Sequence, residues 1–378
     1  GERLPLNLCL AIDRSTSMQG ARLEHVKGAA HQIIDELHEN DTLAVVAFND
    51  RAEVVWPSQP VVNRTLAKAK VSTISASGGT EILKGIQAGL AEIEKRHGQR
   101  VISHLILLTD GQTYGDNESC IAEARQAGAR RIGISAMGIG EDWNDTLLDQ
   151  VAAQSGGVSA YIASPGQIRA LLQQQVRGLG TVFAHGLTLT IGCVEGVRVE
   201  NVFRVAPYLD HLTITDNAVS LGALQADMPL AVLLEIGVAQ KPPGEHQLLQ
   251  LQLTGDIPSL GRQGERLRRD IVLTFTPDEL APEVVPPAIL GALSRVTIYR
   301  MQERAWDMLE SGNTEEANQQ LELIATRLFD LGEPRLARAA MLEAGRIAKG
   351  GEPTAKGRKE IKYGTRSLTI ASRRKSND

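Results

Sequence analysis

Cysteine is scarce in this sequence, and long apolar runs are absent. The three cysteines, Cys9, Cys120 and Cys193, are scattered, and no short spacing pairs any two of them. This usage argues against a disulfide framework and against a structural zinc site. No apolar run approaches the roughly 20 residues that a bilayer span requires, and no secretory signal opens the chain. We therefore expect a soluble, cytoplasmic protein with no membrane segment.

A strong excess of charge of one sign is also lacking. The 378 residues carry 40 basic and 45 acidic side chains, a formal net charge of −5. This balance gives no general reason to expect a polyanion as partner, so we do not expect nucleic acid. The length exceeds what a single hydrophobic core normally organises, and two or three domains are expected.

Residues 1–180 alternate short apolar runs with amphipathic, helix-forming stretches. The apolar runs include LNLCLAI, TLAVVAF, VISHLILLTD, RIGISAMGIG and VSAYIA, and the first two are separated by ARLEHVKGAAHQIIDELHE. This rhythm is typical of a parallel sheet covered by helices. We expect an α/β domain with a doubly wound, mostly parallel six-stranded sheet of the Rossmann-like type and six helices.

Two further regions have different patterns. Residues 181–277 alternate apolar and polar positions over short lengths separated by glycine, proline, asparagine and aspartate, which predicts an antiparallel β-sandwich. Residues 278–350 begin with a proline-rich joint and continue with apolar residues at helical spacing, with glycines between the helical stretches. This pattern predicts a C-terminal helical bundle, with helices over 289–312, 314–332 and 334–350.

The remaining residues, 351–378, form a basic, polar tail that we expect to be extended or disordered. Its lysines and arginines allow contact with nucleic acid or an acidic surface, but Tyr363 is its only aromatic residue. A solvated tail is therefore the favoured interpretation. The stretch IKYGTRSLTI inside it could dock as an added strand.

Five oxygen-bearing side chains fall at the expected ends of strands. Asp13, Ser15 and Ser17 occupy alternate positions directly after the first apolar run. Thr80 follows a glycine pair just before a helix, and Asp110 ends the most apolar strand. Open α/β sheets collect ligands at the carboxyl ends of their strands. Carboxylates and hydroxyls are hard oxygen donors, so the set predicts a site for Mg²⁺, with Mn²⁺ or Ca²⁺ as alternatives, rather than for zinc or copper.

In these positions the sequence resembles the von Willebrand factor type A (VWA) family and its metal-ion-dependent adhesion site. Asp13, Ser15 and Ser17 match the Asp-x-Ser-x-Ser loop, Thr80 the threonine of the second loop, and Asp110 the Thr-Asp-Gly loop. The resemblance implies that the serines and the threonine contact the metal, that the aspartates act largely through bound water, and that a partner protein supplies a carboxylate. The later regions resemble multidomain bacterial members and the inter-alpha-trypsin-inhibitor-like branch.

We therefore expect a metal-dependent protein-binding scaffold rather than an enzyme. A divalent ion with few charged ligands keeps excess positive charge and attracts an external Asp or Glu. Phosphate-loop, zinc-protease and serine-hydrolase motifs are absent from the sequence. Three alternatives stay open: turn-capping residues that bind no metal, a purely structural metal with partner binding through the bundle or tail, and a Mg²⁺-dependent phosphoester hydrolase.

Overall fold

The computed structural model describes residues 3–226, 228–277 and 285–368. By its internal contacts the chain divides into two compact units, one built mainly from residues 1–187 and the other mainly from residues 188–219 and 266–378. Within the described residues, no helix is long and apolar enough to cross a membrane. The cytoplasmic location and the domain boundaries at residues 180, 277 and 350 stay predictions.

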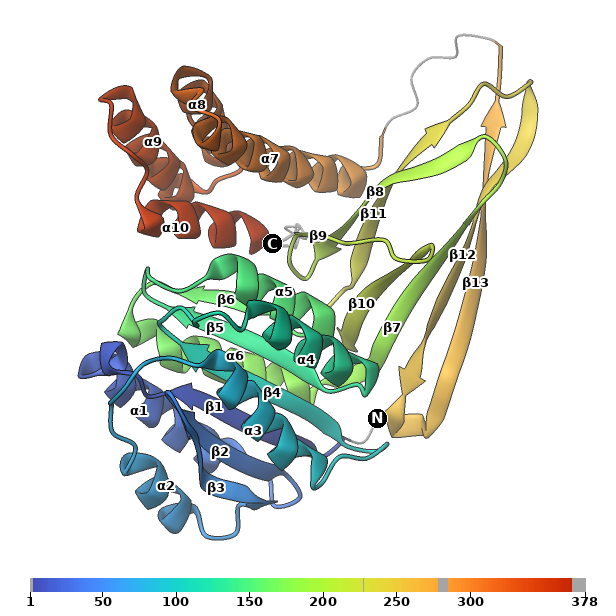
Figure 1. Ribbon diagram of the computed structural model, residues 1–378. Helices are drawn as coiled ribbons and strands as arrows, with labels where there is room; N and C mark the ends of the chain where they lie inside the picture. Colours follow the sequence, from blue (N-terminus) through green and yellow to red (C-terminus); the bar gives the residue numbers. More distant parts are fainter. Residues whose placement is uncertain (1–2, 227, 278–284, 369–378) are drawn as a thin grey trace, which may run out of the picture. The chain divides into compact units, whose positions relative to one another are not determined.

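The first unit contains a six-stranded sheet in the order β3-β2-β1-β4-β5-β6 (Figure 1). All of its neighbouring strands pair in parallel except β2 and β3, which are antiparallel. The doubly wound, mostly parallel sheet predicted from the sequence is therefore confirmed. The strands are β1 (Leu6–Asp13), β2 (Thr42–Phe48), β3 (Ala52–Pro60), β4 (Ile102–Thr109), β5 (Gly133–Ile139) and β6 (Ser159–Ile162).

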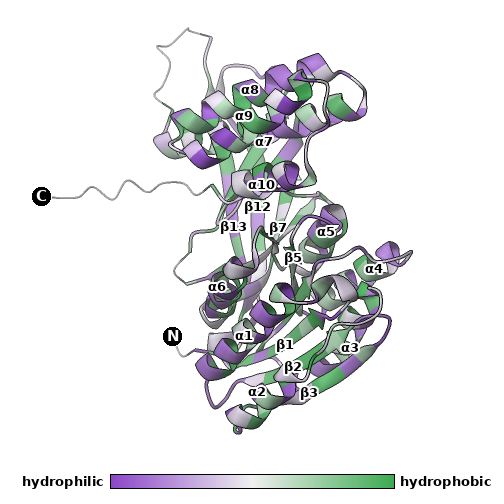
Figure 2. Cartoon of the chain, turned by 90° about the vertical axis from the view of Figure 1, so that its left-hand side faces the viewer, coloured by the Kyte–Doolittle hydropathy of each residue, from purple (hydrophilic) through white to green (hydrophobic). Residues whose placement is uncertain are grey.

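Helices cover both faces of this sheet. Leu6, Leu8, Leu10 and Ile12 of β1 pack in one core with residues of α1, α2 and α6, while α3, α4 and α5 lie on the other face. These helices carry both hydrophobic and hydrophilic residues, as expected for elements with one buried side (Figure 2). The helices are α1 (Ala21–Glu36), α2 (Arg64–Ser72), α3 (Ile82–Glu94), α4 (Asn117–Ala129), α5 (Asp145–Ser155) and α6 (Ile168–Gly180).

Two antiparallel sheets follow, as predicted. One has four strands in the order β10-β7-β12-β13, and the other has three in the order β11-β8-β9. Three of their strands are longer than the short lengths expected from the sequence, with 12 residues in β7 and 14 each in β12 and β13. The strands are β7 (Val182–Cys193), β8 (Val197–Ala206), β9 (Asp210–His211), β10 (Ala218–Gln225), β11 (Ala231–Val238), β12 (Gly244–Ile257) and β13 (Arg262–Phe275).

The C-terminal region of the described chain has four helices (Figure 1). Three of them, α7 (Pro287–Glu310), α8 (Thr314–Asp330) and α9 (Pro334–Ala348), follow the predicted spans closely. Their apolar side chains, with Leu321, Ile324 and Leu328 at the centre, form a core of their own. This confirms the helical character predicted from the spacing of apolar residues.

The basic tail was predicted wrongly as an extended segment. Residues Ala355–Arg366 form a fourth helix, α10, in which Ile361 and Tyr363 are buried. Thr354 caps it by accepting a hydrogen bond from the N–H of Gly357 (2.9 Å). Lysine and arginine are good helix formers, so a high positive charge does not argue against a helix with one apolar side. Residues 369–378 of the predicted tail lie outside the described residues.

His104 is a buried polar residue in the middle of β4. Its Nε2 lies 2.8 Å from the hydroxyl oxygen of Ser135 on β5, and that oxygen also accepts hydrogen bonds from Gln175 and from the N–H of Val158. Burial lowers the pKa of His104 to about 4. The imidazole is therefore neutral in the folded protein at neutral pH, which makes it a packing residue of the sheet.

We predict that His104 makes the fold sensitive to mild acid. The unfolded chain takes up the proton near pH 6.5 and the folded chain only near pH 4, so stability is lost as the pH falls from about 6.5 toward 4. Between pH 7 and pH 5 the loss from this residue amounts to about 2 kcal/mol. Urea unfolding at both pH values should show a larger loss for the wild type than for His104→Gln, and equal losses would contradict the assignment.

Candidate metal site

The predicted site residues lie at the point where the strand order of the six-stranded sheet reverses. The chain passes from β1 to β2 on one side, whereas β4 pairs with β1 on the other. Asp13 pairs with Phe48 at the end of β2, and Ile12 pairs with Leu108 near the end of β4. The loops that follow β1 and β4 therefore leave the same edge side by side, where doubly wound sheets bind ligands.

Asp13 closes β1 and is fully buried. One carboxylate oxygen accepts a hydrogen bond from the N–H of Ser15 (2.7 Å) and the other from the hydroxyl of Thr109 (2.6 Å). Burial raises the pKa of Asp13 to about 6, and the charge of Asp110 adds to this rise, while the hydrogen bonds from Thr109 and Ser15 oppose it. Asp13 thus holds the loop after β1 against the end of β4.

A chain of hydroxyl groups connects Asp13's loop to Asp110. The Ser17 hydroxyl donates to Oδ1 of Asp110 (2.6 Å), and the hydroxyl oxygens of Ser15 and Ser17 are 3.0 Å apart. Because Ser17 has a single hydroxyl proton and gives it to Asp110, Ser15 is the donor in the second contact. The oxygen lone pairs of Ser15 consequently remain available to a cation.

Thr80 is brought to the same edge by a loop that is bonded to the first one. The N–H and the hydroxyl of Thr16 both donate to the carbonyl of Gly78, each at 3.0 Å, and the N–H of Ser77 donates to the carbonyl of Arg14 (2.8 Å). A methyl group on Gly111 would lie 2.9 Å from the hydroxyl oxygen of Thr80. Thr80 therefore lies directly beside the residue that follows Asp110.

The Thr80 hydroxyl faces the same edge from the second loop. Thr80 as a residue is 6% exposed, but its hydroxyl oxygen is not among the buried polar atoms that lack a partner, so it reaches solvent. A hydroxyl oxygen in this position can accept an ion that enters from the solvent side. Together with the Ser15 and Ser17 oxygens and two buried carboxylates, this hydroxyl fits the oxygen donor set that Mg²⁺ requires.

The structure thus brings four of the five predicted residues into one hydrogen-bonded chain and places Thr80 next to it. Their role as metal ligands stays a prediction. Within the described part of the chain, no group of three or more His, Cys, Asp or Glu side chains is arranged so that it could hold a metal ion. A carboxylate-rich or zinc-type centre is therefore not formed by those residues, and hydroxyl oxygens would supply most of the coordination.

Several contributors to this edge were missed from the sequence. Thr109 bonds to Asp13, Arg22 donates to Oδ2 of Asp110, and Asp50 accepts from the N–H of Gly79 (3.1 Å). Thr109 precedes Asp110, and Asp50 follows a buried strand. Their positions at the ends of apolar runs could therefore have indicated that both lie at this edge. Arg22 had none, because its partner is 88 residues away in the chain.

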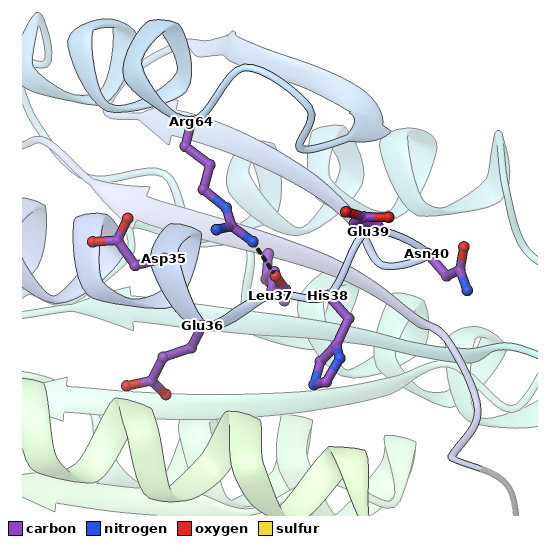
Figure 3. Close-up of a pocket in the computed structure, with 7 residues that line it drawn as sticks. All are labelled: Asp35, Glu36, Leu37, His38, Glu39, Asn40 and Arg64. Carbon is purple, nitrogen blue, oxygen red and sulfur yellow. Dashed lines mark hydrogen bonds between the residues drawn. The ribbon is translucent and has the colours of Figure 1, made fainter.

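A second candidate lies at the opposite edge of the sheet, since it precedes β2 in the chain. It is a hollow of about 520 Å³ around the end of α1 (Figure 3). Arg64 crosses it and donates to the carbonyl of Leu37 (2.8 Å), while Asp35 and Glu36 pair with Lys68 and Arg177. Two of the three lining carboxylates are therefore already paired within the protein, and we assign the hollow no ligand. Its lining residues are Asp35, Glu36, Leu37, His38, Glu39, Asn40 and Arg64.

Comparison with known proteins agrees with this geometry. Residues 7–174 match the family model of the von Willebrand factor type A domain. VWA domains generally mediate metal-dependent protein interactions. Residues 287–371 match a second family, described as the Sll0103-like C-terminal alpha-helical domain. The first region is a VWA domain, and the helices at the end of the chain belong to a recognised type of their own.

The chain belongs to the family of VWA proteins that includes sll0103. It is 33% identical over 332 residues to the uncharacterized protein sll0103 of Synechocystis sp., across 85% of this chain and 78% of the relative. The human inter-alpha-trypsin inhibitor heavy chain H4 is 29% identical over 170 residues, which are 42% of this chain and 18% of that protein. The solved von Willebrand factor type A structure from Catenulispora acidiphila has the same fold, with a TM-score of 0.80, 18% identity, and coverage of 98% and 91%.

We predict that Thr109 is needed to keep the edge of the sheet intact. Thr109→Val would leave one oxygen of the buried Asp13 carboxylate without its donor, at a cost of about 1–3 kcal/mol in the free energy of unfolding. Urea denaturation in metal-free buffer measures the loss. The control is Thr65→Val on the exposed side of α2, which should stay within about 0.5 kcal/mol of the wild type. Equal stabilities of the two variants would show that the bond is dispensable.

Proposed function

We propose that this protein is a metal-dependent binding module that captures a carboxylate of a partner protein. Mg²⁺ would be held by the hydroxyl oxygens of Ser15, Ser17 and Thr80. Asp13 and Asp110 would act on the ion largely through bound water. The observation that carries the proposal is that the Ser15 and Ser17 hydroxyls are bonded in a chain to Asp110, while the Thr80 hydroxyl lies beside Gly111 at the same edge. The match to the VWA family supports it, because that class of module generally binds partners through a metal.

The chemistry of the donor set explains why such an ion would bind a partner. Hydroxyl groups are neutral, so an ion held mainly by hydroxyls keeps much of its positive charge. Asp13 already accepts two hydrogen bonds and Asp110 is bonded to Ser17 and Arg22, which limits how much charge they donate directly. An Asp or Glu side chain from outside would then gain a charge-assisted contact with the ion.

Mg²⁺ is the preferred ion of this proposal, with Mn²⁺ and Ca²⁺ as alternatives. All donors are oxygens, and two of the three hydroxyls come from one short loop, which suits a small ion with strict geometry. Catalysis is not part of the proposal. The buried His104 is bonded to Ser135 inside the sheet, so it is not placed to act as a base at the edge.

A second candidate function rests on the helical region. Leu323, Phe329 and Leu342 of α8 and α9 are 52%, 68% and 63% exposed, which is unusual for large apolar side chains. In this alternative the metal only stabilises the loops of the VWA domain, and a partner binds the helices or the basic segment.

We predict that partner capture requires both the metal and Thr80. Thr80→Val removes only the hydroxyl and keeps the shape of the side chain, so the fold should survive. Immobilised wild type should retain a protein from native lysate with Mg²⁺ and release it with EDTA, and Thr80→Val should retain none. Thr65→Val, exposed on α2, serves as the matched control and should behave as the wild type.

The other outcomes separate the alternatives. Capture of the same protein in Mg²⁺ and in EDTA, by both variants, would contradict metal-bridged binding and favour the helical region. Mg²⁺-dependent turnover of a phosphoester in a broad substrate panel would overturn the exclusion of catalysis.

A further inference from the structure

Arg22, in the first turn of α1, holds its positive charge directly against one residue of the proposed metal site. Its Nη1 forms an ion pair with Oδ2 of Asp110 and lies 3.4 Å from the carbonyl oxygen of Ser17. A methyl group on Gly140, which follows β5, would lie 2.9 Å from Nη2. The guanidinium therefore contacts the loops that follow β1 and β4 and lies close to the one that follows β5.

The two partners of this ion pair differ in exposure. The side chain of Asp110 is fully buried, whereas that of Arg22 is 32% exposed. A buried carboxylate needs a compensating charge, and Arg22 supplies it. Both oxygens of Asp110 are then occupied, one by Ser17 and the other by Arg22. Arg22 is long and partly in solvent, so it can leave Asp110 without moving the backbone.

We propose that Arg22 is an internal competitor of the divalent ion and sets the metal affinity of the site. The inference rests on the proposed function, because it assumes that Asp110 helps to hold a cation. While no ion is bound, the guanidinium neutralises Asp110 and keeps the loops together. An ion that enters near Ser17 and Asp110 meets the repulsion of this charge, and it binds only as Arg22 gives up its carboxylate partner.

This role predicts opposite effects on stability and on affinity. Removing the charge of Arg22 leaves the buried Asp110 without a counter-charge, which destabilises the metal-free protein. The same change removes the competitor, so a divalent ion binds more tightly. A residue that merely packs in the wall of the site would lower both quantities.

The test is Mg²⁺ titration by calorimetry of the full chain, together with the melting temperature in EDTA and in Mg²⁺. Arg22→Gln should bind Mg²⁺ about tenfold or more tightly than the wild type, since close charge pairs are coupled by amounts of this size. Its melting temperature in EDTA should be lower than that of the wild type, and addition of Mg²⁺ should raise its melting temperature by more. Arg22→Lys keeps the charge and should stay close to the wild-type affinity.

Lys84→Gln is the matched control for a general change of charge. Lys84 is exposed in the first turn of α3, a few residues after Thr80, and forms no ion pair with a described residue. Its loss should leave the affinity for Mg²⁺ within about twofold of the wild type, because an exposed charge in water is screened.

The results also separate this inference from the proposed function. Equal or weaker Mg²⁺ binding by Arg22→Gln, with normal binding by the wild type, would overturn the competition and leave the metal site standing. Binding by Arg22→Gln alone would support the competition in its strongest form. Absence of binding heat in every variant, together with melting temperatures that are the same in EDTA and in Mg²⁺, would overturn the metal site, and the competition with it.

Discussion

The rest of the site depends on the buried carboxylate of Asp13 and on the two hydrogen bonds that it accepts. It is buried at the end of β1, and its two hydrogen bonds, from Ser15 and from Thr109, hold the loop after β1 against the end of β4. This attachment brings the Ser17 hydroxyl within 2.6 Å of Asp110. The attachment joins two parts of the chain that are 96 residues apart, and the ion pair of Arg22 with Asp110 joins the same loops a second time.

The two aspartates give this edge a negative charge that the fold only partly compensates. Asp110 has Arg22 as its ion partner, whereas Asp13 has only neutral donors among the described residues. Burial of like charges is unfavourable, and a divalent ion is one way to relieve it. Arg22 and a bound ion can each compensate the negative charge of these aspartates. The metal-free site, with Arg22 on Asp110, and the metal-bound site that binds a partner therefore differ in which cation does so.

Much of this arrangement could be predicted from the sequence, because it follows from local patterns. Apolar runs gave the strands, and polar residues directly after them marked the edge at which Asp13 and Asp110 lie. Helix α10 was missed because its many basic residues suggested a solvated tail, and its apolar side is only evident against α9. Arg22 could not be found from sequence, since its role depends on a contact with Asp110, which follows β4 and is 88 residues away in the chain.

The most direct test of the central claim is a crystal structure with Mn²⁺ bound and its anomalous scattering measured. We expect one strong anomalous peak at the carboxyl edge of the sheet, about 2.2 Å from the hydroxyl oxygens of Ser15, Ser17 and Thr80, with Arg22 displaced from Asp110. No peak at this edge at saturating Mn²⁺, with Arg22 still paired to Asp110, would contradict the account.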